Sequence, residues 1–339
     1  MADQAIDVIG IGNAIVDVLV RVEDEFLAAR GLAKGAMTLI DAEQAVTLYG
    51  EIDGAIEVSG GSAANTMAGI AAFGGCAAFI GKVMDDHLGE VFASDIRAVG
   101  VEFATPPARQ GAPTARSFIL ISRDAQRTMC TFLGASVGLG CDEIDLERIA
   151  AARVVYLEGY LWDAPGAREA FAKAVKIAHR HGRRVALTLS DPFCVARHRK
   201  DFLDLVVNEV DILFANEAEI TSLYQVASFD AALQQVRGHC DIVALTRSEK
   251  GSVVLGNDEI HVIDSHHIAP VVDTTGAGDL YASGFLYGLT RGRGLGTCGS
   301  LGSLAAGEVI SHLGARPVAN LKELAAGILG TACSTNTTR

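Results

Sequence analysis

The sequence predicts an α/β fold with three layers, in which helices cover both faces of a doubly wound, mostly parallel sheet. Short runs of Val, Ile and Leu alternate with longer helical patterns along most of the chain, and this alternation indicates βαβ units. With 339 residues, 50% of them hydrophobic and 20% charged, the chain can bury a large core. We therefore expect one large domain that bears a smaller appendage.

The expected elements follow one another regularly from the N-terminus. Strands over 6–12, 77–83 and 154–159 are separated by helices that begin near Ser62 and Asp85. The second half repeats the pattern, with strands over 184–190, 211–217 and 241–248 and helices over 167–182, 199–210 and 229–239. The longest uncharged run, 63–81, is interrupted by Asn65, Thr66 and two glycines, so it predicts a buried helix, a turn and a strand rather than a membrane span.

Two regions break this pattern, because strand-like runs follow one another there without a helix between them. They are 19–22 with 36–41, and 116–122 with 126–133. We expect them to form a small sheet that acts as a lid over the carboxyl ends of the main strands, where ligands of open α/β sheets bind. The predicted division is a large domain of 1–14, 42–110 and 137–330, a discontinuous β lid of 15–41 and 111–136, and a disordered tail of 331–339.

Charge and cysteine content restrict the partners and the compartment. A formal net charge of −13 disfavours nucleic acid and acidic membrane surfaces, but a small anion held by local backbone groups remains open. The seven cysteines are scattered and form no CxxC pair, which indicates reduced thiols. The N-terminus has no basic segment typical of a signal peptide, so we expect a cytoplasmic protein.

The first motif, GIGNAI, follows the first strand. A G-x-G at this place suggests a dinucleotide fingerprint, but Ile15 stands at the third glycine position and another strand follows instead of a helix. A tight turn is the simpler interpretation. Asn13 and Asp17 are polar among apolar neighbours, and the sequence leaves open whether they cap the turn or contact a ligand.

The second motif, GGSAANT, opens an alanine-rich helix. Ser62 is a natural N-cap. Gly60 and Gly61 either allow close packing or let a ligand approach the backbone, with Asn65 directed at it from the first turn.

The third motif, DTTGAGD, gives the strongest signal. Gly276, Ala277 and Gly278 have little side-chain bulk, so consecutive backbone N–H groups at a helix start can face an anion. Asp279 in the first turn is either an acid stabilised by the helix dipole or a base that accepts a proton from an attacking hydroxyl. The two glycines favour the base, because a simple cap does not need them.

Together the three motifs resemble those of the ribokinase-like (PfkB) carbohydrate and nucleoside kinases, and they occur in the same order. The likeness is closer to the adenosine kinase branch through GNAIVDVL, LSDPF and VDILFANEAE, followed by TRSEKGS. The resemblance implies a ribokinase-like fold with a β lid, and transfer of the γ-phosphoryl group of ATP, with Mg²⁺, to the 5′-hydroxyl of a purine nucleoside, as in adenosine to AMP. The alternatives are a sugar kinase of the same family and a nucleoside-binding protein without catalysis.

The resemblance also implies roles for single residues. Asp17 would bind the ribose hydroxyls, Gly60, Gly61 and Asn65 would hold the sugar with Asn13 nearby, Asp279 would be the base, and Gly276, Ala277 and Gly278 would form the anion hole. Asn216 and Glu219 match the element that organises Mg²⁺ and its waters, or else form an N-cap with a surface acid. Thr246, Ser248 and Gly251 would contact the nucleotide, although Ser248 replaces a common glycine. Arg127 would close onto the phosphates, or else be a solvated lid arginine.

The base pocket and a cation site follow from the same resemblance. Tyr160 and Leu161 match aromatic positions, and Met37, Leu39 and Phe193 are either pocket walls or ordinary core residues. Asp273 and Thr275 fit the first half of a monovalent cation (K⁺) site whose second half would lie near Val309, His312 and Gly314, although Val318 replaces a hydroxyl side chain. The sequence leaves open whether the protein is a monomer or a homodimer.

Overall fold

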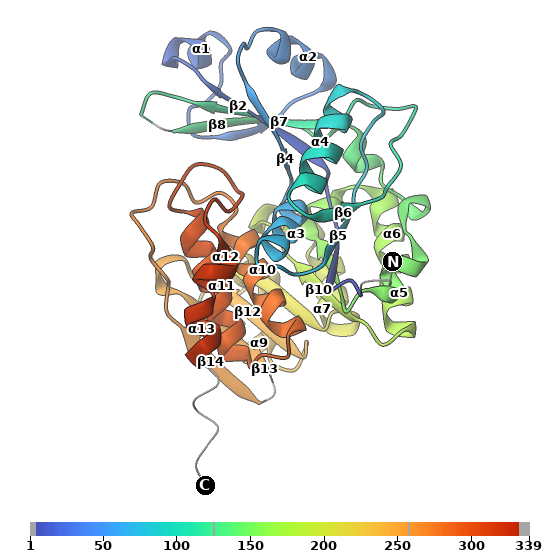
Figure 1. Ribbon diagram of the computed structural model, residues 1–339, viewed down its shortest axis with the longest axis vertical. Coiled ribbons are helices and arrows are strands. Elements are labelled where there is room, and N and C mark those ends of the chain that lie inside the picture. The colour runs from blue at the N-terminus through green and yellow to red at the C-terminus, as the bar shows by residue number, and fades with distance from the viewer. Residues whose placement is uncertain (1–4, 125, 257, 332–339) are drawn as a thin grey trace.

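Two sheets of unequal size organise the chain (Figure 1). The computed structural model describes residues 5–124, 126–256 and 258–331. The large sheet has the order β14-β13-β12-β11-β10-β9-β1-β5-β6 and is parallel from β12 to β6, while β13 and β14 are antiparallel. Its strands are β1 (Val8–Ile11), β5 (Ala77–Ile80), β6 (Val101–Phe103), β9 (Val154–Glu158), β10 (Arg184–Thr188), β11 (Ile212–Asn216), β12 (Ile242–Thr246), β13 (Ser252–Gly256) and β14 (Glu259–Ile263).

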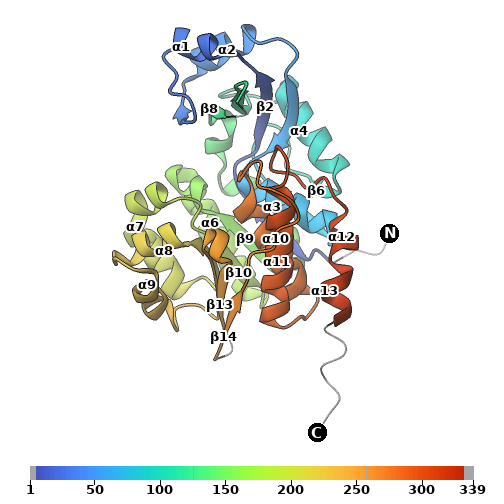
Figure 2. The same cartoon turned by 90° about the vertical axis from the view of Figure 1, so that its left-hand side faces the viewer.

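Helices cover both faces of this sheet, which confirms the predicted doubly wound α/β fold (Figure 2). Each face buries its own apolar cluster, because the strands present aliphatic side chains alternately to the two sides. One face is covered by α5 (Leu146–Ala151), α6 (Pro165–Arg180), α7 (Pro192–Asn208), α8 (Glu217–Tyr224) and α9 (Phe229–Val236). The other is covered by α3 (Ser62–Ala72), α4 (His87–Ala98), α10 (Ala277–Thr290) and α11 (Leu295–Val309), with α12 (Leu321–Leu324) and α13 (Ala326–Thr331) beyond them.

The small sheet lies at one end of the large domain, at the top of Figure 1, and has the order β3-β8-β7-β2-β4. Its strands are β2 (Ile15–Arg21), β3 (Met37–Leu39), β4 (Ile56–Gly60), β7 (Ala115–Ile121) and β8 (Arg127–Phe132), and α1 (Asp24–Ala29) and α2 (Ala42–Gly50) accompany it. The strand β4 corrects the expected division of the chain, which placed 42–110 in the large domain. It pairs antiparallel with β2. The sequence did not indicate it as a strand because its five residues run directly into the glycine motif.

The start of α3 differs from the expectation that Ser62 caps it. Gly61 is the N-cap, with φ of +99°, and Ser62 is the first helical residue. A Cβ atom on Gly61 would lie 2.2 Å from the Asn13 carbonyl oxygen. The left-handed backbone and the close approach therefore both require glycine here, and the Ser62 hydroxyl is free for another use.

The uncharged run 63–81 forms most of α3, a turn and β5, as expected. Of the helices in the described ranges, none has the length and apolar character needed to cross a bilayer. Thr331 ends α13, and the rest of the expected tail, 332–339, lies outside the described residues.

Candidate active site

The second and third sequence motifs meet through Asp279. Its Oδ1 atom accepts a hydrogen bond from the Ser62 hydroxyl at 2.6 Å, and its Oδ2 atom accepts one from Asn65 Nδ2 at 3.0 Å. Both donors lie in the first turn of α3, whereas Asp279 lies in the first turn of α10. The two helix starts, more than 200 residues apart in sequence, are therefore joined at one carboxylate.

Opposing influences act on the charge of Asp279. Burial raises its pKa, while the hydrogen bonds from Ser62 and Asn65 and the charge of Arg316 lower it. The Asn65 Oδ1 atom is buried and has no hydrogen-bond partner among the described residues. That oxygen is an acceptor suited to the hydroxyl of a ligand.

The loop before α10 has the geometry of an anion site. Gly276 is the N-cap with φ of +78°, and a Cβ atom there would lie 2.8 Å from the Cβ of Ala315. Gly278 is exposed, and its Cβ position has no neighbour within 4 Å. The first N–H groups of an α-helix lack intrahelical partners. The Ala277 N–H donates to the Thr274 carbonyl oxygen at 3.3 Å, and the Gly278 N–H lies where an anion would be stabilised.

Asp17 approaches the same place from β2 of the small sheet. A Cβ atom on Gly60 would lie 2.4 Å from the Asp17 Oδ2 atom, so Gly60 makes room for this carboxylate. Burial raises the pKa of Asp17 to about 7, the charges of Arg316 and Arg127 lower it, and that of Asp279 raises it. Asp17 and Asp279 therefore lie close enough to influence each other.

Asn13 has a different role from the expected contact with the sugar. It is buried, its Nδ2 donates to Glu158 Oε1 at 2.6 Å, and its Oδ1 accepts from the Ser136 hydroxyl at 2.9 Å. Glu158 Oε2 also accepts from the Ala63 backbone N–H at 2.9 Å. The amide of Asn13 is thus occupied by Glu158 and Ser136, and Glu158 connects it to the start of α3.

Sequence reasoning missed Glu158, which is buried at the end of β9. Burial raises its pKa to about 7, against the effect of its hydrogen bonds from Ala63 and Asn13. The only signal in the sequence was an acidic residue at the end of the apolar run VVYLE.

Asn216 and Glu219 form a reciprocal capping box at the start of α8. Glu219 Oε1 accepts from Asn216 Nδ2 at 2.6 Å, and Glu219 Oε2 accepts from the Asn216 backbone N–H at 2.9 Å. The alternative of an N-cap is therefore right for Asn216, but that of a surface acid is wrong for Glu219. Glu219 is buried, and burial raises its pKa to about 7.

The loop after β12 contains the residues that we expect to contact the nucleotide. Ser248 has φ of +51°, in the left-handed region where glycine is favoured. Gly251 has φ of +78°, and a Cβ atom there would lie 2.0 Å from the Ile263 carbonyl oxygen. Thr246 ends β12 and is partly exposed beside them.

Arg127 reaches from β8 of the small sheet to the DTTGAGD loop. Its Nη1 atom lies 2.7 Å from Asp273 Oδ2 and donates to the Thr275 hydroxyl at 3.1 Å. Its side chain is only 9% exposed, so the alternative of a solvated lid arginine is wrong. Its Nε and Nη2 atoms are buried and find no acceptor in the described part of the chain.

Asp273, the first expected ligand of a monovalent cation, already has several partners. Besides Arg127, it accepts hydrogen bonds from the Thr275 hydroxyl at 2.8 Å and from the Gly314 backbone N–H at 3.0 Å. The structure thus brings Asp273, Thr275 and Gly314 together, and Arg127 forms an ion pair with the Asp273 carboxylate.

Most of the residues expected around a base are exposed to solvent. Phe193, Leu39, Met37 and Tyr160 are 75%, 60%, 53% and 39% exposed, which excludes ordinary core packing for the first three. Leu161 is buried in the core and is therefore no wall of the pocket.

Arg316 is a second residue that sequence reasoning missed. It lies in the loop between α11 and α12, and its guanidinium donates to the carbonyl oxygens of Ser59 and Ala64 at 2.8 Å and 3.0 Å. No motif marked it, because its neighbours in the fold lie about 250 residues earlier in the chain.

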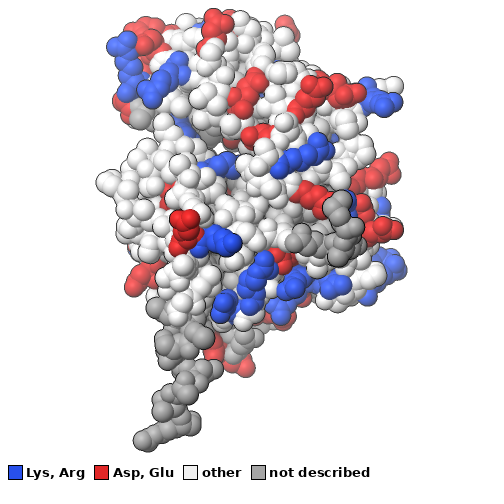
Figure 3. Space-filling model, viewed as in Figure 1, with Lys and Arg blue, Asp and Glu red and all other residues white. Residues whose placement is uncertain are grey.

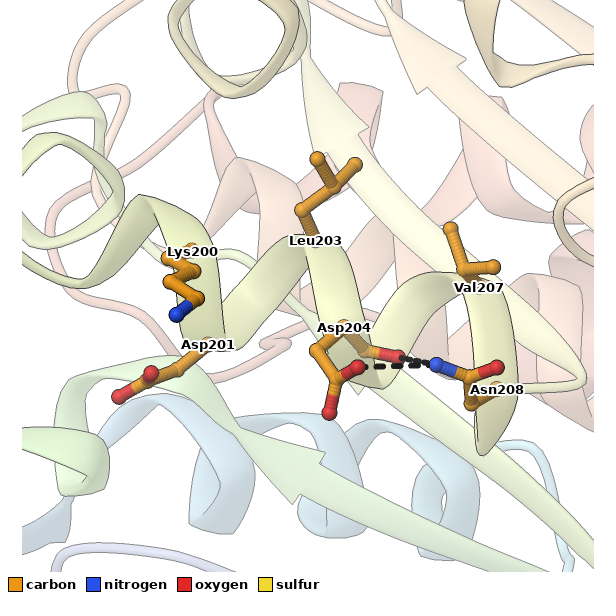
Figure 4. A pocket seen from close by; sticks show the side chains of 6 residues that line it. All are labelled: Lys200, Asp201, Leu203, Asp204, Val207 and Asn208. Carbon is orange, nitrogen blue, oxygen red and sulfur yellow. Dashed lines mark hydrogen bonds between the residues drawn. The ribbon is translucent and has the colours of Figure 1, made fainter.

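A separate hollow of about 450 Å³ lies on the outside of α7 (Figure 4). One helix supplies its whole lining, and Asn208 there donates to Asp204. This hollow has none of the site residues among its lining, which is Lys200, Asp201, Leu203, Asp204, Val207 and Asn208.

A protein-family comparison agrees with this geometry. The pfkB family of carbohydrate kinases matches residues 36–321. The chain belongs to that family. It is therefore a phosphotransferase that acts on an alcohol acceptor, in a family that uses ATP and usually Mg²⁺.

Similar proteins span both substrate classes. A probable sugar kinase from Rhizobium etli CFN 42 is 51% identical, with a TM-score of 0.88, over 96% of this chain and 99% of that one. An adenosine kinase from Sinorhizobium meliloti is 50% identical, with a TM-score of 0.87, over the same shares. A 5-dehydro-2-deoxygluconokinase from Bacillus velezensis is 30% identical over 74% of this chain and 79% of that protein.

Proposed function

We propose that this kinase transfers the γ-phosphoryl group of ATP to the 5′-hydroxyl of a purine nucleoside, with adenosine as the favoured acceptor and AMP as the product. The observation that supports this most is the pair of hydrogen bonds from Ser62 and Asn65 to Asp279. Through them the Asp279 carboxylate lies between the start of α3, which we expect to bind the acceptor, and the start of α10, which we expect to bind an anion. A hydroxyl bound there would meet the base and the phosphate together.

In the proposed mechanism Asp279 accepts the proton of the attacking hydroxyl. The backbone N–H groups of Gly276, Ala277 and Gly278 stabilise the charge that develops on the transferred group. Arg127 contributes as well, since two of its buried N–H-bearing atoms, Nε and Nη2, have no protein acceptor in the described ranges. These two atoms suit the oxygens of a phosphate.

Acceptor recognition would combine polar and apolar contacts. Asp17 would accept hydrogen bonds from two ribose hydroxyls, and the unpartnered Asn65 Oδ1 would accept a third. Gly60 and Gly61 keep the backbone beside Asp17 clear of side chains. The exposed Met37, Leu39 and Phe193 would be covered by a base, which a free sugar does not have.

ATP and its Mg²⁺ would bind along the neighbouring strand ends. Asn216 and Glu219 fit a role in orienting the waters of Mg²⁺, because the carboxylate is fixed by its capping box and each oxygen retains a second lone pair. The ion would offset negative charge on the phosphates. The nucleotide would be contacted by Thr246, Ser248 and Gly251. A K⁺ ion beside Asp273 and Thr275 would require the Arg127 guanidinium to leave the Asp273 carboxylate.

A free sugar is the second candidate acceptor. It is favoured by Leu161, which is buried, because, of the two positions Tyr160 and Leu161, only the first carries an aromatic ring. The relatives named as sugar and 5-dehydro-2-deoxygluconokinases agree with this alternative.

The test is ADP release from ATP and Mg²⁺ with adenosine, inosine, guanosine, cytidine, ribose and fructose. We expect adenosine to give the highest kcat/KM and ³¹P NMR to place the phosphate on the 5′-oxygen. Turnover of ribose or fructose without any response to nucleosides would favour the sugar kinase. Adenosine binding without ADP release would contradict catalysis.

A further inference from the structure

The segment Gly314–Arg316 contacts both halves of the site. The Gly314 backbone N–H donates to Asp273 Oδ2 at 3.0 Å. Ala315 packs on Gly276, where a Cβ atom would lie 2.9 Å from the Ala315 Cα. Arg316 donates to residues on either side of Gly60 and Gly61. Three consecutive residues therefore bridge the anion loop and the acceptor loop.

The guanidinium of Arg316 uses its planar shape for this purpose. Its Nε and Nη2 atoms both donate to the Ser59 carbonyl oxygen, at 3.2 Å and 2.8 Å. The Nη2 atom also donates to the Ser59 hydroxyl at 3.0 Å. The Nη1 atom donates to the Ala64 carbonyl oxygen at 3.0 Å. Ser59 is fixed in turn by Asp95, which accepts from its N–H at 2.7 Å and its hydroxyl at 2.6 Å. An ammonium group cannot span the same set of acceptors.

The charge of Arg316 acts on the two carboxylates of the site. Burial raises the pKa of both Asp17 and Asp279, and Arg316 lowers both. Burial lowers the pKa of Arg316 itself to about 10, so it remains charged at neutral pH. The titratable groups that interact with Asp279 include the acids Asp17 on β2, Glu158 on β9 and Glu219 on α8, and the phenols Tyr156 on β9 and Tyr160 after it. The polar Ser62 and Asn65 face it from α3.

We propose that Arg316 is a positioning residue that holds the acceptor loop, through its hydrogen bonds to Ser59 and Ala64, against the phosphoryl-transfer loop. This role rests on the proposed function, in which Asp279 is the base. Arg316 acts through Ser59, Ala64 and the two carboxylates, and no contact with a substrate is required.

The test compares Arg316→Met and Arg316→Lys with Arg293→Met, which removes an exposed arginine between α10 and α11. The readout is kcat/KM for adenosine as a function of pH. In Arg316→Met the acid limb should move up by about one pH unit, with about a tenfold loss below it, because a nearby opposite charge lowers a carboxyl pKa by at least that much. Arg316→Lys should keep the acid limb and lose kcat, and Arg293→Met should match the wild type.

An Arg316→Met enzyme with the wild-type acid limb and kcat would overturn the proposal. If Arg316→Met does not fold, Arg316→Lys decides through kcat, and a wild-type kcat there would contradict the positioning role. A folded wild type that turns over no acceptor would contradict the proposed function instead. In that case ¹³C NMR titration of the aspartate carboxyl groups still tests Arg316, because it needs no substrate. Two carboxyls should titrate at higher pH in Arg316→Met, and an unchanged titration would overturn the proposal.

Discussion

At the scale of single residues, several carboxyl groups of the site are buried, and burial disfavours their charged form. Burial raises the pKa of Asp17, Glu158 and Glu219 to about 7 in each case. The arginines whose charges act on Asp17 come from distant segments, with Arg127 on β8 and Arg316 after α11. The charge state of the site therefore depends on tertiary contacts that bring the cations in.

Asp17→Asn should stabilise the unliganded protein at neutral pH and weaken acceptor binding. The pKa of Asp17 rises from 3.8 to about 7 on folding, so the native state holds a proton that the unfolded state has lost. The contribution of Asp17 to the free energy of unfolding therefore falls as pH rises from about 4 to about 7.

Thermal unfolding at pH 4 and pH 8 checks this, and the gain in Tm of Asp17→Asn over the wild type should be larger at pH 8. The same variant should raise KM for the acceptor more than it lowers kcat. An unchanged acceptor KM would refute the binding role.

Which residues could be predicted depends on where their partners lie. Asp279 and Gly276 stand inside a short motif whose local pattern already indicates an anion-binding helix start, and Asn65 stands inside one that allows a ligand to approach the backbone. Arg316 and Glu158 carry no such pattern, because their importance comes from side chains and backbone groups far away in sequence, such as Ser59 for Arg316 and Ala63 for Glu158.

At the scale of elements, glycines decide how closely the helix starts approach their neighbours. Gly61 combines φ of +99° with a Cβ position 2.2 Å from the Asn13 carbonyl oxygen, whereas the Cβ position of Gly278 is open. The two glycines thus form a matched pair, one needed for the fold and one needed for access to the helix start.

Gly61→Ala should destabilise the protein by roughly 1–3 kcal/mol or more, since a strained backbone and a steric conflict act together. Gly278→Ala should leave stability unchanged or raise it by up to about 1 kcal/mol. It should nevertheless slow phosphoryl transfer by roughly tenfold or more, because its methyl group would stand beside the anion-binding N–H groups. Urea unfolding and steady-state kinetics on both variants measure these effects, and normal kinetics for Gly278→Ala would count against the anion hole.

The elements themselves were largely predictable, because apolar strands alternate with amphipathic helices. The exceptions have local causes. The strand β4 merges with the glycine motif, and β13 follows β12 without a helix and pairs with it antiparallel, which the βαβ pattern does not anticipate.

At the scale of the whole molecule, the small sheet and the large domain share the site. Asp17 and Arg127 belong to the small sheet, whereas Asp273 and Asp279 belong to the α10 region of the large domain. The ion pair between Arg127 and Asp273 joins the two parts directly. In the proposed mechanism, acceptor binding and phosphoryl transfer would therefore depend on how the two parts sit together, as expected where closure excludes water.

The positive charge that could bind an anion is local, whereas the protein as a whole is acidic. The chain has a net charge of −13, and acidic and basic side chains are interspersed on the face seen in Figure 3. Inside the site, Arg127 and Arg316 provide local positive charge, and the start of α10 adds the positive end of a helix dipole. An anion can therefore be bound locally by a protein that is acidic as a whole.

The measurement that tests the central claim most directly is single-turnover phosphoryl transfer from ATP to adenosine by Asp279→Asn, beside Asp230→Asn. Asp230 is the matched control, because it also lies in the first turn of a helix, α9, and is exposed. We predict that Asp279→Asn binds adenosine largely as the wild type does but transfers phosphate at least on the order of 10²-fold more slowly, while Asp230→Asn behaves normally. Near-normal transfer by Asp279→Asn would contradict its role as the base.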